Sequence, residues 1–461
     1  MKIAFIEPVT ESLNIFSKFK LPRLGTILLA TILHDQGYDT RVYIEKKTQV
    51  LKMNLEVDLA AISTITATAP AAYALADHFR ARGIPVVMGG PHVTFLPEEA
   101  LEHADYVVRG EGETSLPSLI RALEQGSPLH DVPGLAFRQG DTLVTNPPAP
   151  AIADLDSLPH PDFNLVHNYN RDLVLGRRTI PVQTSRGCPF DCTFCSVTGM
   201  FGRRYRFRSV EHIMAELRRY SPRRTTVFFY DDNFTANRRR AKELLRAMIA
   251  ENLGLTWSTQ VRTDAARDPE LLDLMKRAGC ATLYIGFESV DPAALSEMKK
   301  SQTVEEMRHA VREIRRRGIH VHGMFVFGFD ADTETTVSTT VRFAIKEKID
   351  TAQFLILTPL PGTQFFHDMT AQRRIIDRHW THYDAHHVKF KPAHFSGYAL
   401  QWAQIRAHAR FYSPFRVLAR LFRGKAVAFL LGMYARSLNR QWKRVEYSYL
   451  QMLKYYCRVY G

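Results

Sequence analysis

Short apolar runs alternate with helical patterns in two long stretches of this chain, and this alternation constrains the fold more than any other feature of its 461 residues. Such alternation is typical of a mostly parallel sheet that is covered by helices. The first series lies within residues 1–126, and the second begins near Pro181. We therefore predict an α/β protein with two sheets, in a chain long enough for two or three cores.

The first series predicts a Rossmann-like domain with helices at Leu24–Gln36 and Ala71–Arg82. Ligands of such sheets bind at the carboxyl ends of the strands, where glycines let a bulky group approach the backbone. The expected strands are Lys2–Ile6, Thr40–Ile44, Leu59–Ser63, Pro85–Met88 and Tyr106–Val108. The residues after these strands that we expect to share one rim are Ser63, Thr64, Gly89, Gly90, His92, Gly110 and Glu111.

Residues 127–170 differ in composition from both series. Prolines and turn residues are frequent there, including Pro147 and Pro148. The runs Leu135–Phe137 and Thr142–Thr145 flank a Gln-Gly-Asp turn and predict a hairpin. We interpret this stretch as a linker that contains a hairpin.

The second series repeats about six times and predicts a partial (β/α)6 barrel of the TIM type within residues 171–370. Asp268 and Asp291 each precede a proline, and Thr303 with Glu306 forms a capping box, so helix starts are well marked. Active sites of such barrels lie at the carboxyl ends of the strands. The expected strands are Pro181–Thr184, Thr226–Tyr230, Leu255–Gln260, Thr282–Phe287, His320–Phe327 and Ala352–Thr358.

Three cysteines, Cys188, Cys192 and Cys195, follow the first barrel strand with Cys-x3-Cys-x2-Cys spacing. Three thiolates on one loop can hold three irons of a [4Fe–4S] cluster and leave the fourth iron open for chemistry. A zinc site would call for a fourth Cys or His close by, and reduced structural cysteines are the other alternative. An odd total of five cysteines does not favour a disulfide framework.

This loop resembles the cluster loop of the radical S-adenosylmethionine (SAM) superfamily, including Gly187 before the first cysteine and Phe194 before the last. The resemblance implies that Cys188, Cys192 and Cys195 ligate the cluster and that SAM chelates the open iron. It also implies that an electron, delivered by a flavodoxin or ferredoxin type donor, cleaves SAM to methionine and a 5′-deoxyadenosyl radical.

The same resemblance assigns SAM contacts at other strand ends. Asp231 and Asp232 stand where this superfamily has a segment that holds the SAM amino group, although either could instead cap a helix. Arg262 could pair with the SAM carboxylate, or it could be a solvent-exposed arginine. Glu288 and Ser289 match a pair that contacts the ribose, and the alternative is a rim carboxylate that caps the next helix.

The glycine-rich loops of the first series resemble the cobalamin-binding domain that precedes many radical SAM cores, and Pro359-Leu-Pro-Gly-Thr363 resembles a turn of the same subclass. The sequence departs from many cobalamin domains in having no Asp-x-His-x-x-Gly motif. Two alternatives follow: cobalamin binds without a protein histidine on cobalt, or the domain has lost its ligand.

The C-terminal region, 371–461, ends in a strongly basic tail. From Gln401 to Gly461 there are twelve Lys and Arg residues against one acid, Glu446, which gives a net charge of +11 out of +14 for the chain. Arg416, Arg420 and Arg423 interleave with large apolar side chains between Phe415 and Phe422, ahead of the apolar run Ala426–Ala435. Three interpretations stay open: contact with an anionic membrane surface, packing on the barrel, or a nucleic-acid patch.

No apolar run approaches the length of a membrane-spanning helix, which is about 20 residues. We expect a cytoplasmic protein whose tail is a candidate for peripheral contact with the inner membrane surface, and we do not expect a nucleic-acid partner.

The leading functional interpretation is a cobalamin-dependent radical SAM enzyme that modifies an unactivated carbon of a hydrophobic or lipid-like small molecule, most simply by C-methylation. Ring closure or carbon–carbon coupling, as in anaerobic porphyrin cyclases, is the alternative within the same resemblance. A non-catalytic, membrane-associated binding or sensor protein that keeps the cluster is the third interpretation.

Overall fold

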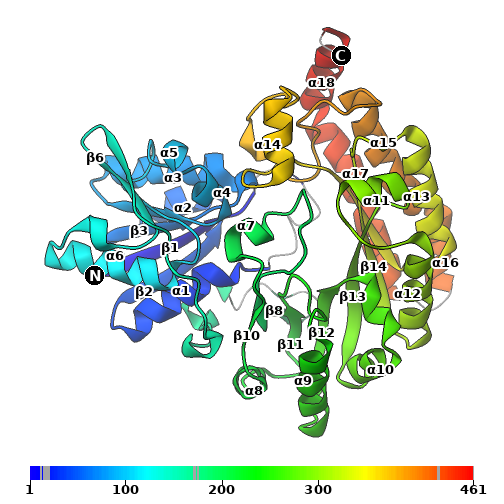
Figure 1. Cartoon of the computed structure of the whole chain (residues 1–461), viewed down its shortest axis with the longest axis horizontal. Helices are drawn as coiled ribbons and strands as arrows, with labels where there is room; N and C mark the ends of the chain where they lie inside the picture. The colour runs from blue at the N-terminus through cyan, green and yellow to red at the C-terminus, as the bar shows by residue number, and fades with distance from the viewer. Residues whose placement is uncertain (11–12, 14–20, 170–172, 174–175, 423–425, 460–461) are drawn as a thin grey trace.

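The computed structural model describes residues 1–461 except 11–12, 14–20, 170–172, 174–175, 423–425 and 460–461. Two α/β bodies lie next to each other, and the last helices pack against the outer side of the second body (Figure 1). The carboxyl ends of both parallel sheets point toward the space where the two bodies meet.

The first body is built on a seven-stranded sheet with the order β2-β1-β3-β4-β5-β6-β7. The first five strands pair in parallel, which confirms the strands predicted from the sequence. Their bounds are β1 Lys2–Pro8, β2 Asp39–Glu45, β3 Leu59–Ser63, β4 Val86–Gly89 and β5 Tyr106–Val108.

The predicted hairpin is present as β6 (Leu135–Gln139) and β7 (Thr142–Thr145), but it is more than a feature of a linker. Strand β6 pairs antiparallel with β5, so the hairpin extends the first sheet at its edge. Leu135 and Phe137 are buried in the core below this sheet, and that burial explains why the hairpin joins it.

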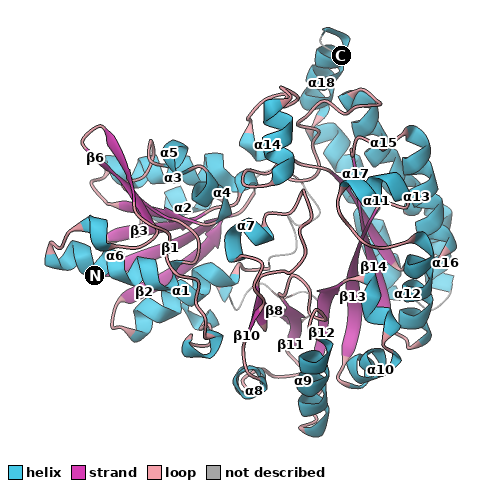
Figure 2. Ribbon diagram, in the orientation of Figure 1, coloured by secondary structure: helices cyan, strands magenta, loops and turns pink. Residues whose placement is uncertain are grey.

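Helices cover both faces of the first sheet (Figure 2). Alternate residues of β1 and β3 enter two different cores: Ile3 and Phe5 belong to one, and Ala4 and Ile6 belong to the other. A parallel sheet buried on both faces needs such continuous apolar strands. The helices of this body are α1 Leu24–Asp35, α2 Lys47–Met53, α3 Ala69–Ala81, α4 Pro91–Phe95, α5 Pro97–Ala100 and α6 Gly112–Gln125.

The second body contains a six-stranded, fully parallel sheet with the order β15-β14-β13-β12-β11-β8, as expected for a partial barrel. A separate two-stranded ribbon, β9 (Ser185–Arg186) with β10 (Arg206–Phe207), brackets the cysteine loop. The bounds of the six strands are β8 Arg178–Val182, β11 Thr225–Phe229, β12 Thr256–Val261, β13 Cys280–Glu288, β14 His320–Phe327 and β15 Thr351–Ile356.

The helices of the second body start as the sequence predicts. Asp268 and Asp291 accept hydrogen bonds from backbone amides of the helices that they precede, and Thr303 forms the capping box with Glu306. These contacts satisfy amides that have no partner inside a helix. The helices are α7 Val197–Phe201, α8 Val210–Leu217, α9 Arg238–Ala250, α10 Pro269–Arg277, α11 Pro292–Glu297, α12 Val304–Arg316, α13 Glu334–Lys346 and α14 Gln364–Ala371.

The C-terminal region is helical, as predicted, and its first helix packs on β15 and α13. Among the helices that the structure describes, none has the length and apolar character needed to cross a membrane. The helices are α15 Gly397–Phe411, α16 Pro414–Phe422, α17 Ala426–Val445 and α18 Tyr447–Val459. Single-turn 3-10 helices occur at Thr66–Thr68, Leu129–Asp131, Leu155–Ser157, Phe163–Leu165, Thr263–Arg267 and Trp380–His382.

Candidate functional site

A cavity of about 370 Å³ lies where the carboxyl ends of the two sheets meet. Its walls come from the loops after β1, β3, β4 and β5 and from the cysteine loop, α7 and the ends of β11 and β12. The predicted site residues that line it are Ser63, Gly89, Gly90, Gly110, Glu111 and Asp232. The glycine rim of the first body and the cysteine-loop side of the barrel therefore line the same cavity.

Gly90 is required at this rim by the backbone. Its φ is +101°, and a Cβ atom there would lie 2.5 Å from the carbonyl oxygen of Thr64. Thr64 is fully buried, and its amide donates to the carbonyl oxygen of Gly89. Thr64 thus fixes the two loops against each other and, although predicted as a ligand contact, it does not line the cavity.

His92 also lies outside the cavity, although the sequence placed it on the ligand rim. Its side chain is buried, and Nε2 lies 3.2 Å from Oε1 of Glu99. The same oxygen accepts hydrogen bonds from Tyr73 and from Nε1 of Trp380. The single turn α4 directs His92 into this buried network, so its ring is used to join the first body to the segment after the barrel.

The Gly110–Glu113 turn connects the two bodies by charge. Glu113 pairs with Arg186 at 2.6 Å, and Glu111 accepts two hydrogen bonds from Arg206. Burial opposes ionisation of Glu111, but the arginines and the amide of Ile152 hold the pKa of its carboxyl below the ordinary value. Glu111 therefore lines the cavity with its charge already compensated by the barrel.

The cysteine loop is shaped by its own backbone and by a glycine. Gly187 has a φ of +87°, and a Cβ atom there would lie 2.5 Å from the carbonyl oxygen of Arg204. The amide of Cys195 donates to the carbonyl oxygen of Cys192, which turns the loop back on itself. Phe194 packs edge-on against Phe329. This turn holds the last two cysteines on one short arc.

The three cysteine sulfurs lie close enough to influence one another electrostatically. Burial raises the pKa of each thiol, that of Cys195 to about 12, and the charges of Cys188 and Cys192 add to the effect on Cys195. All three are partly buried rather than enclosed. Iron binding replaces these thiol protons, because the thiolate is the ligand form. A partly buried loop that carries three cysteines fits a cluster held from one side.

Asp231 and Asp232 have different surroundings. Asp231 is buried and accepts hydrogen bonds from the amides of Thr184 and Ser185, so it holds the chain that leads into the cysteine loop rather than facing a ligand. Asp232 opens into the cavity while protein surrounds it, and this desolvation, with the charge of Asp231, raises its pKa to about 7. Of the two, only Asp232 is placed to meet a bound group.

Arg262 and Glu288 approach the cysteine loop from the barrel side. The guanidinium carbon of Arg262 lies 3.9 Å from the ring centre of Phe190, and the charges of Arg262 and Glu288 both act on Cys192. Glu288 adopts a φ of +60° and pairs with Nζ of Lys300 at 2.6 Å. Neither Arg262 nor Glu288 lines the 370 Å³ cavity.

Ser289 takes a local role, and Lys300 is a residue that the sequence did not single out. Ser289 is buried, and its hydroxyl accepts from the amide of Asp291 ahead of α11. Lys300 follows another lysine at the end of a polar stretch, which is an ordinary surface pattern. Its burial beside Glu288 and Cys192 results from the tertiary fold, and no local signal could have revealed it.

The residues present fit the groups that the sequence implies. The rim glycines leave room beside the backbone for a large flat ligand, and the cavity extends from this rim to Ser196 and Val197, directly after the last cysteine. The cysteine loop offers three sulfur ligands, and Arg262, Glu288 and Lys300 surround it with charges of both signs. These features suit cobalamin at the glycine rim and a zwitterion such as SAM beside the cysteine loop.

Comparison with known protein families matches both bodies. The model described as "Radical SAM superfamily" matches residues 182–344, and the model described as "B12 binding domain" matches residues 13–120. The corresponding cofactors are a [4Fe–4S] cluster, SAM and cobalamin.

Curated relatives span most of the chain. An uncharacterized methyltransferase, PH0819, of Pyrococcus horikoshii is 32% identical, over 91% of this chain and 94% of the relative. The bacteriochlorophyllide d C-12(1)-methyltransferase of Chlorobaculum tepidum is 28% identical, over 90% of this chain and 89% of the relative. The anaerobic magnesium-protoporphyrin IX monomethyl ester cyclase of Cereibacter sphaeroides is 31% identical, over 82% of this chain and 65% of the relative.

The fold is also found among solved structures. The cobalamin-dependent SAM radical enzyme OxsB, solved with aqua-cobalamin and SAM bound, superposes with a TM-score of 0.70 over 98% of this chain and 75% of OxsB, at 16% identity. The two family models, the relative that is 32% identical over nearly its whole length, and this fold agree. The chain belongs to the radical SAM enzymes that carry an N-terminal B12-binding domain.

Proposed function

We propose that this protein is a cobalamin-dependent radical SAM methyltransferase that methylates an unactivated carbon of a hydrophobic, lipid-like small molecule. The observation that carries the proposal is the shared cavity: its walls come from the glycine rim of the B12-binding domain and from the residues that follow the last cysteine of the cluster loop. Methyl transfer requires these two sites to face one another, because the methyl donor must reach a carbon from which hydrogen has been removed.

When bound, the cluster with SAM supplies a radical that removes hydrogen, and cobalamin supplies the methyl group. The residues of the chain would bind the cluster, SAM and cobalamin and keep these groups apart. Cys188, Cys192 and Cys195 would ligate the cluster, with Arg262 and Glu288 orienting SAM beside the loop. Ser63, Thr64, Gly89, Gly90 and Gly110 would form the cobalamin rim, in which Thr64 acts through its contact with Gly90. Asp232 would face the reacting groups, and with a pKa of about 7 it can hold or release a proton near neutral pH.

The walls of the cavity favour an apolar substrate. Most of the side chains that line it are aliphatic or aromatic, and the charged ones are Arg23, Glu111, Glu113, Arg186 and Asp232. Apolar walls exclude water from a radical intermediate and bind hydrophobic substrates by the area that they bury. The apolar lining residues include Phe5, Leu24, Leu29, Ile62, Val87, Val108, Leu116, Met200 and Phe201.

Helix α16 supports a peripheral contact with an anionic membrane surface. Phe415 and Phe422 are 85% and 81% exposed, and Leu418 and Leu421 are also exposed, so one face of this helix is apolar and uncovered in the described chain. The surrounding tail is basic, which complements anionic lipids. A lipid-like substrate would reach the enzyme from such a surface.

The arginines of α16 contribute less to this surface than the sequence suggested. Arg416 donates to the carbonyl oxygen of Phe411, and Arg420 lies over the rings of Phe411 and Tyr412. Both therefore help to pack the helix on α15, while Arg423 lies outside the described residues. Packing and membrane contact are thus complementary roles of opposite faces of α16.

A reaction that starts from the cluster also needs a reductant, for which we propose a flavodoxin or ferredoxin type protein. A ring-closing or carbon–carbon coupling activity is the second candidate, because the cyclase of Cereibacter sphaeroides is nearly as similar as the methyltransferase of Pyrococcus horikoshii.

Mass spectrometry of extracts can separate the two activities. Cells with and without the gene would be grown anaerobically with methyl-deuterated methionine, and their lipid and small-molecule extracts compared. The proposal predicts a compound that gains a deuterated methyl group only when the gene is present. A gene-dependent compound that has lost hydrogen and gained no label would support the cyclase candidate and contradict methyl transfer.

A further inference from the structure

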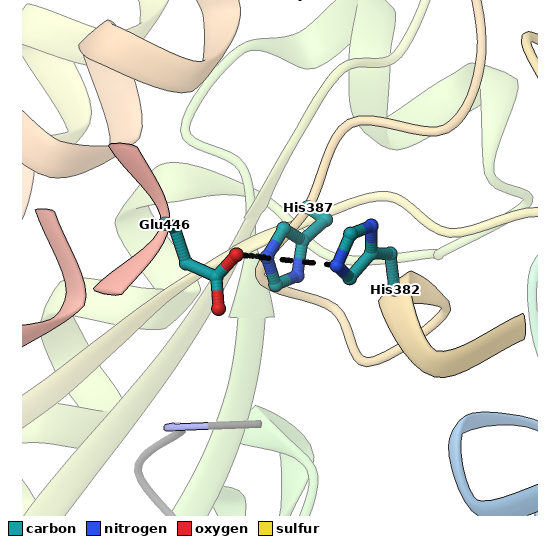
Figure 3. A group of neighbouring side chains, drawn as sticks. All are labelled: His382, His387 and Glu446. Atoms are coloured by element: carbon teal, nitrogen blue, oxygen red, sulfur yellow. Dashed lines mark ion pairs between the residues drawn. The ribbon is translucent and has the colours of Figure 1, made fainter. Parts of the chain in front are cut away.

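Two histidines and a glutamate converge at a place remote in sequence from the cysteine loop. His382 ends a 3-10 turn after the barrel, His387 lies five residues later, and Glu446 stands at the corner between α17 and α18. In Figure 3 the carboxylate of Glu446 faces His387, and the rings of His382 and His387 lie side by side, stacked with their centroids 4.2 Å apart and their planes at 16°. One ligand atom from each residue lies within 4.8 Å of the other two.

The distances are close to those of a metal coordination shell. Nε2 of His387 lies 3.4 Å from Oε2 of Glu446, and Nε2 of His382 lies 3.9 Å from the same oxygen. Zinc binds imidazole nitrogen and carboxylate oxygen at about 2.0–2.2 Å, so tetrahedral ligand atoms lie about 3.3 Å apart. To complete the geometry, the half-buried ring of His382 would have to turn out of its stack with His387, so that its Nε2 faces the other two ligand atoms.

The second nitrogen of each ring is already oriented by another side chain. Nδ1 of His387 lies 2.9 Å from Oδ1 of Asp384, and Nδ1 of His382 lies 3.2 Å from Nδ1 of His379. A histidine that ligates a metal nearly always gives its other N–H to a carboxylate or similar group, which fixes the ring. Nε2 of His387 is buried and pairs with the carboxylate of Glu446, and a metal ion would replace the proton in this contact.

The charges at this place also favour a divalent cation. The side chains of Asp384 and Glu446 are 2% and 11% exposed, and a buried carboxylate must be compensated. Glu446 is the single acid of the basic tail, yet it is buried against histidines rather than among the tail's exposed cations. A proton on His387 would balance one of the two negative charges, whereas a divalent metal ion would balance both.

The cluster stands where three parts of the chain meet. Trp380, two residues before His382, donates its indole N–H to Glu99 of the first body. Glu446 belongs to the C-terminal helices, and His387 packs against Trp442 and Tyr449 of those helices. An ion held here would tie the segment after the barrel to the C-terminal helices and so secure its contact with the first body.

The geometry points to a site for a divalent transition-metal ion, of which Zn²⁺ is the best chemical match, ligated by His382 Nε2, His387 Nε2 and a carboxylate oxygen of Glu446. Asp384 orients His387, and water completes the shell. Imidazole with carboxylate suits zinc among first-row metals, and three protein ligands leave one position for solvent. This inference concerns the architecture of the chain and stands independently of the proposed function.

Zinc binding can be measured without interference from the cysteine loop. The full chain would be made with Cys188→Ser, Cys192→Ser and Cys195→Ser together, stripped of metal with a chelator, and titrated with Zn²⁺ against a chromophoric competitor. We expect about one Zn²⁺ per chain. Glu446→Gln and His387→Ala should each lower the zinc affinity at least a hundredfold, and Asp384→Asn should lower it tenfold to a hundredfold through the ring that it orients.

The matched control is His394→Ala, which removes an exposed histidine from the same segment and should leave zinc affinity unchanged. Thermal unfolding gives a second readout that needs no folded His387→Ala variant: Zn²⁺ should raise the unfolding temperature of the triple-serine chain but not that of the same chain carrying the near-isosteric Glu446→Gln. Absence of stoichiometric zinc in the triple-serine chain, or equal affinity after Glu446→Gln, would overturn the site and leave a protonated His387 between the two carboxylates.

Discussion

Arg206 of the barrel forms a bidentate ion pair with Glu111 of the B12-binding domain. Nη2 and Nη1 donate to the two carboxylate oxygens at 2.5 and 2.9 Å, and the two side chains are only 5% and 6% exposed. Arg206 also donates to the carbonyl oxygen of Ile152, in the segment between the bodies. This buried pair fixes the distance between the proposed cobalamin rim and the cysteine loop.

Replacement of Arg206 by Ala should therefore loosen the two bodies. Removing one partner of a buried ion pair leaves the other charge uncompensated and lowers the free energy of unfolding by about 3–5 kcal/mol. Arg186 lies 3.6 Å from Glu111 and partly compensates its charge, so the loss should be near the lower value. We expect a lower unfolding temperature and faster proteolysis near residue 152. Arg218→Ala removes a bidentate partner from the exposed pair with Glu251 and should lower the stability far less, because solvent screens that pair. Equal losses in the two variants would mean that the Arg206 pair does not hold the interface.

Glu288→Gln tests the proposed SAM contact while keeping the size of the side chain. A charge-assisted hydrogen bond contributes about 1.5–3 kcal/mol, so SAM affinity should fall about tenfold to a hundredfold with the cluster intact. Equilibrium binding of SAM to anaerobically reconstituted protein measures this. Glu305→Gln, on an exposed residue of α12, is the control. Unchanged affinity in Glu288→Gln would assign Glu288 to pairing with Lys300 alone.

The sequence predicted the strands and the helix starts well because their signals are local. Apolar runs of strand length, proline after Asp268 or Asp291, and glycine before Cys188 each report on neighbouring residues. Helix caps and backbone turns depend on few distant contacts, which explains why those predictions were confirmed.

The errors and omissions concern side chains whose partners are distant in sequence. His92 follows a strand like a ligand residue, yet Glu99 and Trp380 hold it in a buried network. The partnership of Lys300 with Glu288 depends on how the barrel closes around its strands. His382 and His387 meet Glu446 only through packing of the last helices. The periodicity of apolar residues in the sequence does not predict such side-chain contacts, because they depend on the tertiary arrangement.

The metal-free protein should lose stability as the pH rises toward 9. Burial alone would disfavour the charged imidazole, but Asp384 and Glu446 raise the pKa of His387 to about 9. Because this pKa is above the unfolded value of about 6.5, the stabilising contribution is complete below pH 6.5 and is lost as the pH rises through 9. Unfolding temperatures of chelator-treated protein between pH 6 and 10 would show the decline. His387→Gln should flatten that part of the profile, and an equally steep decline in the variant would contradict the assignment.

Binding to anionic liposomes tests the exposed face of α16. Phe415→Ser with Phe422→Ser removes the two most exposed aromatic rings of that helix, and sedimentation with anionic vesicles should fall severalfold. Wild-type binding should also weaken with salt, because each Lys or Arg near such a surface contributes about 1 kcal/mol and is screened. Tyr455→Ser, which changes a 68% exposed ring on α18, should bind as the wild type does. Full binding by the double variant would remove α16 from the membrane contact.

Formation of 5′-deoxyadenosine tests the central claim most directly. Anaerobically reconstituted protein, reduced in the presence of SAM, should contain about four irons per chain and release 5′-deoxyadenosine, because three cysteines leave one iron open. Cys192→Ala should abolish both, whereas Cys457→Ala, on a half-buried cysteine in α18, should retain both. Release of 5′-deoxyadenosine by Cys192→Ala at the wild-type rate, or its absence from wild-type protein that carries a full cluster, would contradict the account.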